Sequence, residues 1–178
     1  MEIVATELPG LQVIRPRIFE DARGSFIKTF HAGLFRERGL DFTPQEEFFS
    51  TSAKDVVRGM HFQLPPVAHA KLVYCLAGRV LDVVLDLRKY SPAFGRCHAR
   101  ELNATNREIL FIPIGFAHGF LALEHGTTMI YQTSTVHSPA HDAGIAWNSF
   151  GFDWPVKNPQ LSGRDNKFPA LHDFQSPF

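Results

Sequence analysis

Residues 71–87 read KLVYCLAGRVLDVVLDL, two runs rich in β-branched and aliphatic residues that flank Ala77-Gly78-Arg79. Runs of this composition are typical of β-strands, and a short glycine-containing link between them is typical of a hairpin. We therefore predict strands over residues 71–76 and 80–87, paired with each other.

The same kind of pattern recurs along most of the chain. A second hairpin is predicted where residues 119–123 and 127–133 flank Glu124-His125-Gly126. Only residues 32–38, which end before Gly39, predict a helix, and it is short. Further strands are predicted at residues 11–16, 24–30, 56–63 and 108–112.

The C-terminal stretch, residues 147–178, differs in having prolines at positions 155, 159, 169 and 177. This spacing predicts loops and short turns that wrap around the strands. Many short strands separated by glycine and proline are typical of a β-sandwich or barrel. No repeat or composition break divides the chain, so we expect a single all-β domain over residues 1–178.

Composition excludes several classes of function. The 178 residues contain 18 Lys and Arg against 18 Asp and Glu, so no basic excess is available to neutralise a nucleic-acid backbone. The longest apolar runs are far too short to span a membrane, and no leader-like segment follows Met1. Cys75 and Cys97 lack motif spacing and are expected to be reduced. These features predict a cytoplasmic protein with neither nucleic-acid nor membrane partners.

Alternation along the predicted strands places polar residues among apolar ones on one shared face. Unpaired buried charge is costly, so such a face predicts a pocket that water or a ligand enters. Arg58 falls on the opposite side from His61, unless Gly59 hosts a bulge or Arg58 serves a neighbouring subunit. The shared face comprises Val57, Gly59, His61, Gln63, Lys71, Val73, Cys75, Val80, Asp82, Val84, Asp86, Met129, Tyr131 and Thr133.

Two histidines are candidates for chemistry. His61 lies in mid-strand within RGMHFQ, residues 58–63, where it is either a hydrogen-bonded core residue or a general base that titrates near neutral pH. His118 follows the Pro- and Gly-containing turn PIG, residues 113–115, which delivers it to the start of a strand. A metal-binding cupin would need at least three such ligands, and Gln63 stands where a second histidine would follow His61. We therefore expect no metal.

Short segments spread over nearly the whole chain occur together in one known family. Through them the chain resembles the dTDP-4-dehydrorhamnose 3,5-epimerase family of nucleotide-sugar epimerases. The segments are DARGSF (21–26), RGMHFQLPP (58–66), KLV (71–73), GRVLDVVLDLR (78–88), SP (91–92) with Gly95, IPIGFAHGF (112–120), Tyr131, IAW (145–147), WP (154–155) and LSGRD (161–165).

The resemblance implies a cupin-like jelly-roll β-barrel, a homodimer, and a nucleotide-sugar substrate. It implies inversion of C3 and C5 of a nucleoside-diphosphate 4-keto-6-deoxy sugar without a cofactor, in deoxysugar and O-antigen precursor synthesis. Position by position, it implies the catalytic residues His61 as base, Asp165 as its orienting carboxylate, Tyr131 as proton donor and Lys71 as enolate stabiliser. It also implies substrate contacts by Arg23, Arg58, His118, Phe19 and Phe26.

The chain departs from the family pattern at the substrate slot. Glu46 and Phe48 stand where members usually carry Gln and Asn, and His137 stands where they carry a second Tyr. We assign these three and Gln63 to substrate binding. The departures leave open a single-centre epimerase or ketoisomerase acting on another nucleotide sugar, such as a CDP-linked 3,6-dideoxy 4-keto sugar. A non-catalytic sugar-binding jelly roll is a further alternative.

Overall fold

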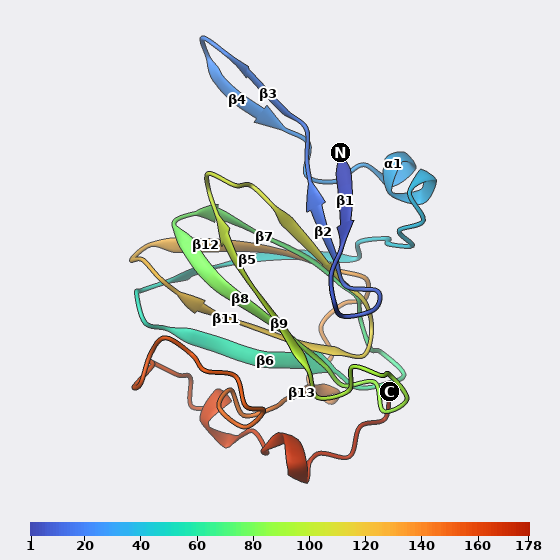
Figure 1. The fold of residues 1–178 in the computed structure, drawn as a ribbon, viewed down its shortest axis with the longest axis vertical. Helices are drawn as coiled ribbons and strands as arrows, with labels where there is room; N and C mark the ends of the chain where they lie inside the picture. Colours follow the sequence, from blue (N-terminus) through green and yellow to red (C-terminus); the bar gives the residue numbers. More distant parts are fainter.

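The computed structural model describes residues 1–178, in which two antiparallel sheets face each other (Figure 1). The six-stranded sheet has the order β1 (Glu2–Ala5), β2 (Gln12–Arg15), β10 (Ile109–Ile112), β7 (Lys71–Ala77), β12 (Thr127–Thr133), β5 (Glu46–Ser52). The five-stranded sheet has the order β13 (Asp142–Gly144), β6 (Val57–Gln63), β11 (Phe116–Ala122), β8 (Arg79–Asp86), β9 (Cys97–Asn103). The prediction of an all-β jelly roll is confirmed, although the two sheets stay separate and do not close into a barrel.

Both predicted hairpins are wrong. β7 pairs with β10 and β12, whereas β8 pairs with β9 and β11, so the link at Gly78 carries the chain from one sheet to the other. The β11–β12 link crosses between the sheets in the same way. Gly78 has φ of 75°, and a Cβ atom there would lie 2.5 Å from Thr127 Oγ1. Glycine therefore permits a tight corner here, close to the start of β12. The local sequence of such a corner is the same as that of a hairpin turn, so the two could not be distinguished from sequence.

The predicted helix is α1 (Ala32–Glu37), whose first turn is capped by His31 Nδ1 accepting from the Leu34 N–H. The short 3₁₀ helices η1 (Asp165–Lys167) and η2 (Leu171–Asp173) lie in the C-terminal stretch. No helix of this structure has the length and apolarity needed to cross a membrane. Strands β1, β3, β5, β9 and β13 were not predicted, because β5 (EEFFSTS) and β9 (CHARELN) are largely polar and the other three are very short.

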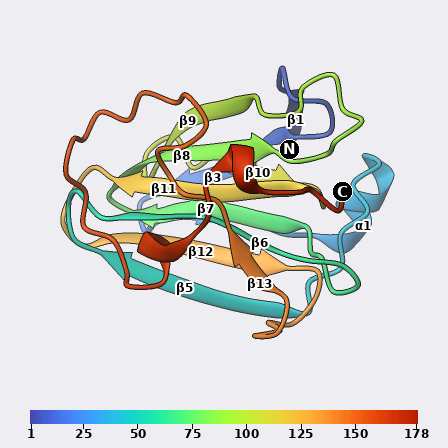
Figure 2. The ribbon, with the colours of Figure 1, turned by 90° about the horizontal axis from the view of Figure 1, so that it is seen from below.

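Three apolar clusters hold the layers together, and two of them border the five-stranded sheet. Between the sheets, Val73, Val84 and Met129 belong to a buried core, as the alternation predicts, and Phe120 packs with them. On the outer face of the five-stranded sheet, Phe62 and neighbouring residues pack against the C-terminal stretch, which lies across that sheet in Figure 2. The predicted wrapping of residues 147–178 is thereby confirmed. Because this sheet is covered on both faces, its inner strands β11 and β8 are mostly apolar and almost fully buried along their length.

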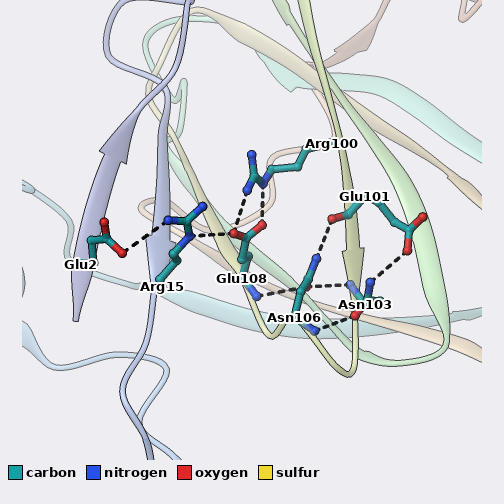
Figure 3. A network of polar contacts seen from close by, with 7 residues as sticks. All are labelled: Glu2, Arg15, Arg100, Glu101, Asn103, Asn106 and Glu108. Atoms are coloured by element: carbon teal, nitrogen blue, oxygen red, sulfur yellow. Dashed lines mark hydrogen bonds and ion pairs between the residues drawn. The ribbon is translucent and has the colours of Figure 1, made fainter.

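An antiparallel hairpin, β3 (Ile18–Asp21) and β4 (Gly24–Ile27), extends away from both sheets (Figure 1). Its base is fastened by a polar network around the buried carboxylate of Glu108 (Figure 3). Arg15 Nε donates to Glu108 Oε1 at 2.9 Å, and Arg100 Nε donates to Oε2 at 2.5 Å. The hydrogen bond from Arg100 lowers the pKa of the Glu108 carboxyl. Since Arg15 ends β2, this network fixes the point from which the hairpin projects.

Candidate active site

A cavity of about 440 Å³ lies between the two sheets and is lined by side chains from both. Nine of the thirteen site residues predicted from the sequence line it. They are Glu46, Phe48, Arg58, His61, Gln63, Lys71, His118, Tyr131 and His137.

His61 and Asp165 form a dyad at one wall of this cavity. His61 Nε2 lies 2.8 Å from Asp165 Oδ1, and the Gly59 N–H donates to Asp165 Oδ2 at 3.3 Å. Burial raises the Asp165 pKa, but the hydrogen bond from His61 and the other bonds outweigh it and lower that pKa overall. Burial lowers the His61 pKa against the opposing effect of Asp165. An ionised carboxylate at Nε2 favours the tautomer with its proton there, which leaves Nδ1 of a neutral ring free to accept a proton.

A bulge in β6 brings Arg58 into the same cavity as His61. His118 of β11 pairs with His61 and Phe120 pairs with Arg58, so β6 has one more residue than β11 over this stretch. Gly59 has φ of 149°, and a Cβ atom there would lie 2.6 Å from the Gly119 Cα. The prediction that a bulge at Gly59 re-aims one of the two side chains is confirmed.

Lys71 lies at the start of β7 with its side chain buried in the cavity wall. Its Nζ donates to the His61 carbonyl oxygen at 2.9 Å, which leaves two further donor positions. Burial lowers the Lys71 pKa to about 8, while Asp142 and Asp82 act in the opposite direction. The amine is therefore largely an ammonium at neutral pH and can stabilise negative charge that develops in the cavity.

Tyr131 projects from the six-stranded sheet, whereas His61 projects from the five-stranded sheet. Its hydroxyl lies 3.1 Å from Ser50 Oγ, and its ring stacks on Phe48 with centroids 4.8 Å apart. Burial raises the Tyr131 pKa further above its ordinary value, so the phenol stays protonated. A proton donor and a proton acceptor therefore belong to opposite walls of one cavity.

A second histidine–carboxylate pair lies deeper in the wall. His118 Nε2 is 2.8 Å from Asp82 Oδ2, and both side chains are buried. Alternation correctly placed Asp82 on the inner face, but nothing in the sequence paired it with a residue 36 positions away.

Three further predicted residues, Glu46, Gln63 and His137, lie at the edge of the cavity. Glu46 Oε2 accepts from the His137 N–H at 2.6 Å, so the departures at 46 and 137 contact each other. Gln63 uses Nε2 to donate to the Val67 carbonyl and Oε1 to accept from the Ser138 N–H. Its amide thus ties two loops together at the edge of the cavity.

Phe19, Arg23 and Phe26 do not reach this cavity. They lie on the β3–β4 hairpin, where the Arg23 side chain is 90% exposed and pairs with Asp21 at 2.6 Å. Within one chain, their predicted contact with the site is therefore not formed.

The cavity also contains residues that were missed. His69, Asp142 and Arg164 line it, and Arg164 pairs with Asp142 while Arg164 Nε lies 3.5 Å from Asp165 Oδ1. Arg164 stands beside Asp165 in the LSGRD segment, so that motif could have revealed it. Asp142 and His69 carried no such signal. The structure contains no group of three or more His, Cys, Asp or Glu side chains able to hold a metal.

Comparison with known proteins gives consistent results. The family model for dTDP-4-dehydrorhamnose 3,5-epimerase matches residues 5–173. A curated enzyme of that name from Shigella flexneri is 41% identical over 170 residues, 93% of each chain. The Bacillus anthracis enzyme, solved with TDP and PPi bound, has a TM-score of 0.93 at 35% identity and covers 96% of this chain and 99% of its own. The Legionella pneumophila enzyme, solved with dTDP-4-keto-L-rhamnose, has a TM-score of 0.92 at 34% identity, covering 96% and 93%.

Proposed function

The chain belongs to the dTDP-4-dehydrorhamnose 3,5-epimerase family, and on that premise we propose that its cavity inverts C3 and C5 of a dTDP-linked 4-keto-6-deoxy sugar. The observation that carries the proposal is the placement of the His61–Asp165 dyad and Tyr131 on opposite sheets across one cavity. Inversion requires removal of a proton from one face of a carbon and its return to the other face. The two walls provide those two groups.

The first step is proton removal beside the ketone. His61 Nδ1 accepts the proton, the C–H electron pair forms a double bond from that carbon to C4, and the C4=O electron pair moves onto the oxygen to give an enolate. Asp165 keeps the imidazole oriented and stabilises the imidazolium that forms. The Lys71 ammonium interacts more strongly with the enolate than with the neutral ketone, so it lowers the barrier.

The second step is proton return from the opposite face. The Tyr131 hydroxyl donates to the carbon, the enolate collapses back to the ketone, and the carbon leaves with inverted configuration. Solvent then removes the extra proton from the His61 imidazolium and returns a proton to the Tyr131 phenolate. Arg58 supports binding, because its planar guanidinium can pair with diphosphate oxygens while Nε donates to Ser52 Oγ at 3.0 Å.

Proton NMR in deuterated water tests this function. We expect the wild-type chain to exchange the hydrogens at both C3 and C5 of dTDP-4-keto-6-deoxyglucose. Exchange at one carbon, or clear preference for a CDP-linked sugar, would instead support the single-centre alternative. Tight binding without any exchange would support a non-catalytic sugar-binding protein.

Replacing Lys71 by Met should lower kcat by about 100-fold with a much smaller effect on KM, since one well-placed electrostatic donor is worth roughly this much. Methionine retains most of the aliphatic volume, and Lys157→Met, on an exposed lysine outside the cavity, is the control. Wild-type activity should also fall as pH rises through about 8, where Lys71 loses its proton. An effect on KM alone would contradict this role.

We also propose a homodimer in which the β3–β4 hairpin of each chain enters the partner's cavity. The hairpin carries Phe19 and Phe26, which are 47% and 62% exposed, and the Arg23 side chain, which stays exposed although it pairs with Asp21. Exposed aromatic side chains on a projecting hairpin are typical of an interaction surface. In this arrangement Phe19, Arg23 and Phe26 would contact substrate in the cavity of the partner chain.

Mixing two inactive variants tests the exchange. A His61→Ala chain keeps an intact hairpin, and an Arg23→Ala chain keeps an intact base. If hairpins are exchanged, each mixed dimer contains one complete site, so random reassociation should restore about a quarter of wild-type sites. No restoration, or full activity in a monomeric protein, would contradict the proposal.

We place the enzyme in the cytoplasm. Cys75 and Cys97 are both free thiols, as a reducing compartment allows. Burial raises the Cys75 pKa to about 11, so this thiol is unreactive at neutral pH.

A further inference from the structure

His69 differs from every other histidine that lines the cavity. It lies in the loop between β6 and β7, and both of its ring nitrogens are buried without a hydrogen-bond partner in the protein. His61 and His118 each have a carboxylate partner at 2.8 Å, and the polar end of Tyr131 meets Ser50. Buried polar groups are almost always paired, so an imidazole with two free nitrogens beside a substrate cavity requires an explanation.

The loop around His69 is firmly held, so the unpaired ring is not the result of a loose segment. The Ala70 N–H donates to Ser134 Oγ at 2.9 Å, and the Ser134 N–H donates back to the Ala70 carbonyl at 3.0 Å. On the other side, Thr135 Oγ1 donates to the Val67 carbonyl at 3.0 Å. The backbone on both sides of His69 is therefore fixed against the loop that follows β12.

The surroundings keep His69 neutral. Burial lowers its pKa to about 3, and the ammonium of Lys71 acts in the same direction. A neutral imidazole has one N–H donor and one acceptor nitrogen. A sugar hydroxyl, which both donates and accepts, is a suitable partner, whereas a phosphate oxygen can only accept.

We propose that His69 recognises the C3 hydroxyl of the sugar and thereby selects substrates that carry it. This inference rests on the proposed function. His69 precedes Lys71 by two residues, and both line the same cavity. If Lys71 stabilises the oxygen on C4, His69 lies near an adjacent ring carbon. Of those two carbons, C3 carries a hydroxyl and C5 carries a methyl group, and only the hydroxyl pairs with an imidazole. The ring turns about its Cβ–Cγ bond, a broad torsion, to present a nitrogen to the hydroxyl.

The selection predicts that a 3,6-dideoxy sugar is a poor substrate, because its C3 leaves His69 unpaired. If His69 selects in this way, the residues that differ from the family pattern, Glu46, Phe48 and His137, are not sufficient to make a 3-deoxy sugar the preferred substrate.

The test compares dTDP-4-keto-6-deoxyglucose with its 3-deoxy analogue, following deuterium exchange at C5, which both contain. We expect wild-type kcat/KM to favour the hydroxylated sugar by about 10- to 100-fold. His69→Leu should lose that factor on the hydroxylated sugar and change little on the analogue. His69→Gln, which keeps a donor and an acceptor, should retain most of the preference. His172→Leu, on an exposed histidine outside the cavity, is the control.

Three results would overturn the inference. Equal losses on both sugars in His69→Leu would mean that the residue has only a structural role. Weaker binding of dTDP alone to His69→Leu, measured by calorimetry, would mean that it contacts the nucleotide. In either case wild-type exchange would leave the proposed function intact. Absence of exchange with both sugars in the wild type would overturn the proposed function and this inference together.

Discussion

A His61→Asn variant should lose about 10²–10⁴-fold in kcat and in the rate of solvent deuterium exchange into the substrate, as expected for loss of a general base. Asparagine is smaller and its amide does not reach the position of Nε2, so the contact with Asp165 is lost, but Asp165 still accepts from the Gly59 N–H and the fold should be retained. The amide cannot accept the substrate proton, so both half-reactions stop. Proton NMR in deuterated water measures the exchange directly.

The pH dependence gives an independent check. Burial lowers the His61 pKa, so the ring stays neutral and active as pH falls until a value below the ordinary 6.5 or so. Activity of the wild type should therefore decrease when the pH falls below that value. The residual activity of His61→Asn should not show this decrease. His125→Asn, outside the cavity, is the matched control. Near-normal exchange in His61→Asn would eliminate this residue as the base.

A Tyr131→Phe variant should form the inverted product about 10²–10⁴-fold more slowly while the substrate carbon still exchanges its hydrogen with solvent. Removing the hydroxyl leaves His61, Asp165 and Lys71 in place, so the enolate still forms and is reprotonated from its original face. The variant should fold normally, because the ring still stacks on Phe48. Loss of Ser50's partner is the only change in hydrogen bonding within the chain.

The ratio of exchange to inversion distinguishes this role from a structural one. Ser50→Ala removes the same hydrogen bond but leaves the Tyr131 hydroxyl, so it should keep most of the inversion activity. Equal loss of exchange and inversion in Tyr131→Phe would indicate a role in enolate formation. Full turnover by this variant would mean that another acid, such as His137, returns the proton.

Much of the site was predictable because alternation is a local property of an extended chain. Adjacent side chains of a strand point to opposite faces, so Lys71, Tyr131 and Asp82 were correctly placed on the inner face from sequence alone. Arg58 violated that rule, and of the two explanations open from the sequence, a bulge at Gly59 or a role in a neighbouring subunit, the structure shows the bulge. Gly59 lies between Arg58 and His61, and glycine tolerates the backbone conformation of a bulge, so the sequence itself indicated where the bulge would be.

The two wrongly predicted hairpins have a cause that is not local. The links at Gly78 and at residues 123–126 have the composition of hairpin turns, but they connect strands of opposite sheets. A turn sequence determines that the chain reverses, whereas the partner of each strand depends on which other strands present matching edges. β10 and β12 occupy both edges of β7, and they come from segments more than 30 residues away.

The sequence by itself determined the all-β class, the face on which the polar residues lie, and the resemblance that identified His61, Asp165, Tyr131 and Lys71. These depend on residue type, local spacing and motif. Only the tertiary structure paired His118 with Asp82, left His69 without a partner, and held the β3–β4 hairpin away from its own cavity. Each of these is a contact, or the lack of one, between segments distant in the chain, and it arises from the packing of the whole fold rather than from any local pattern.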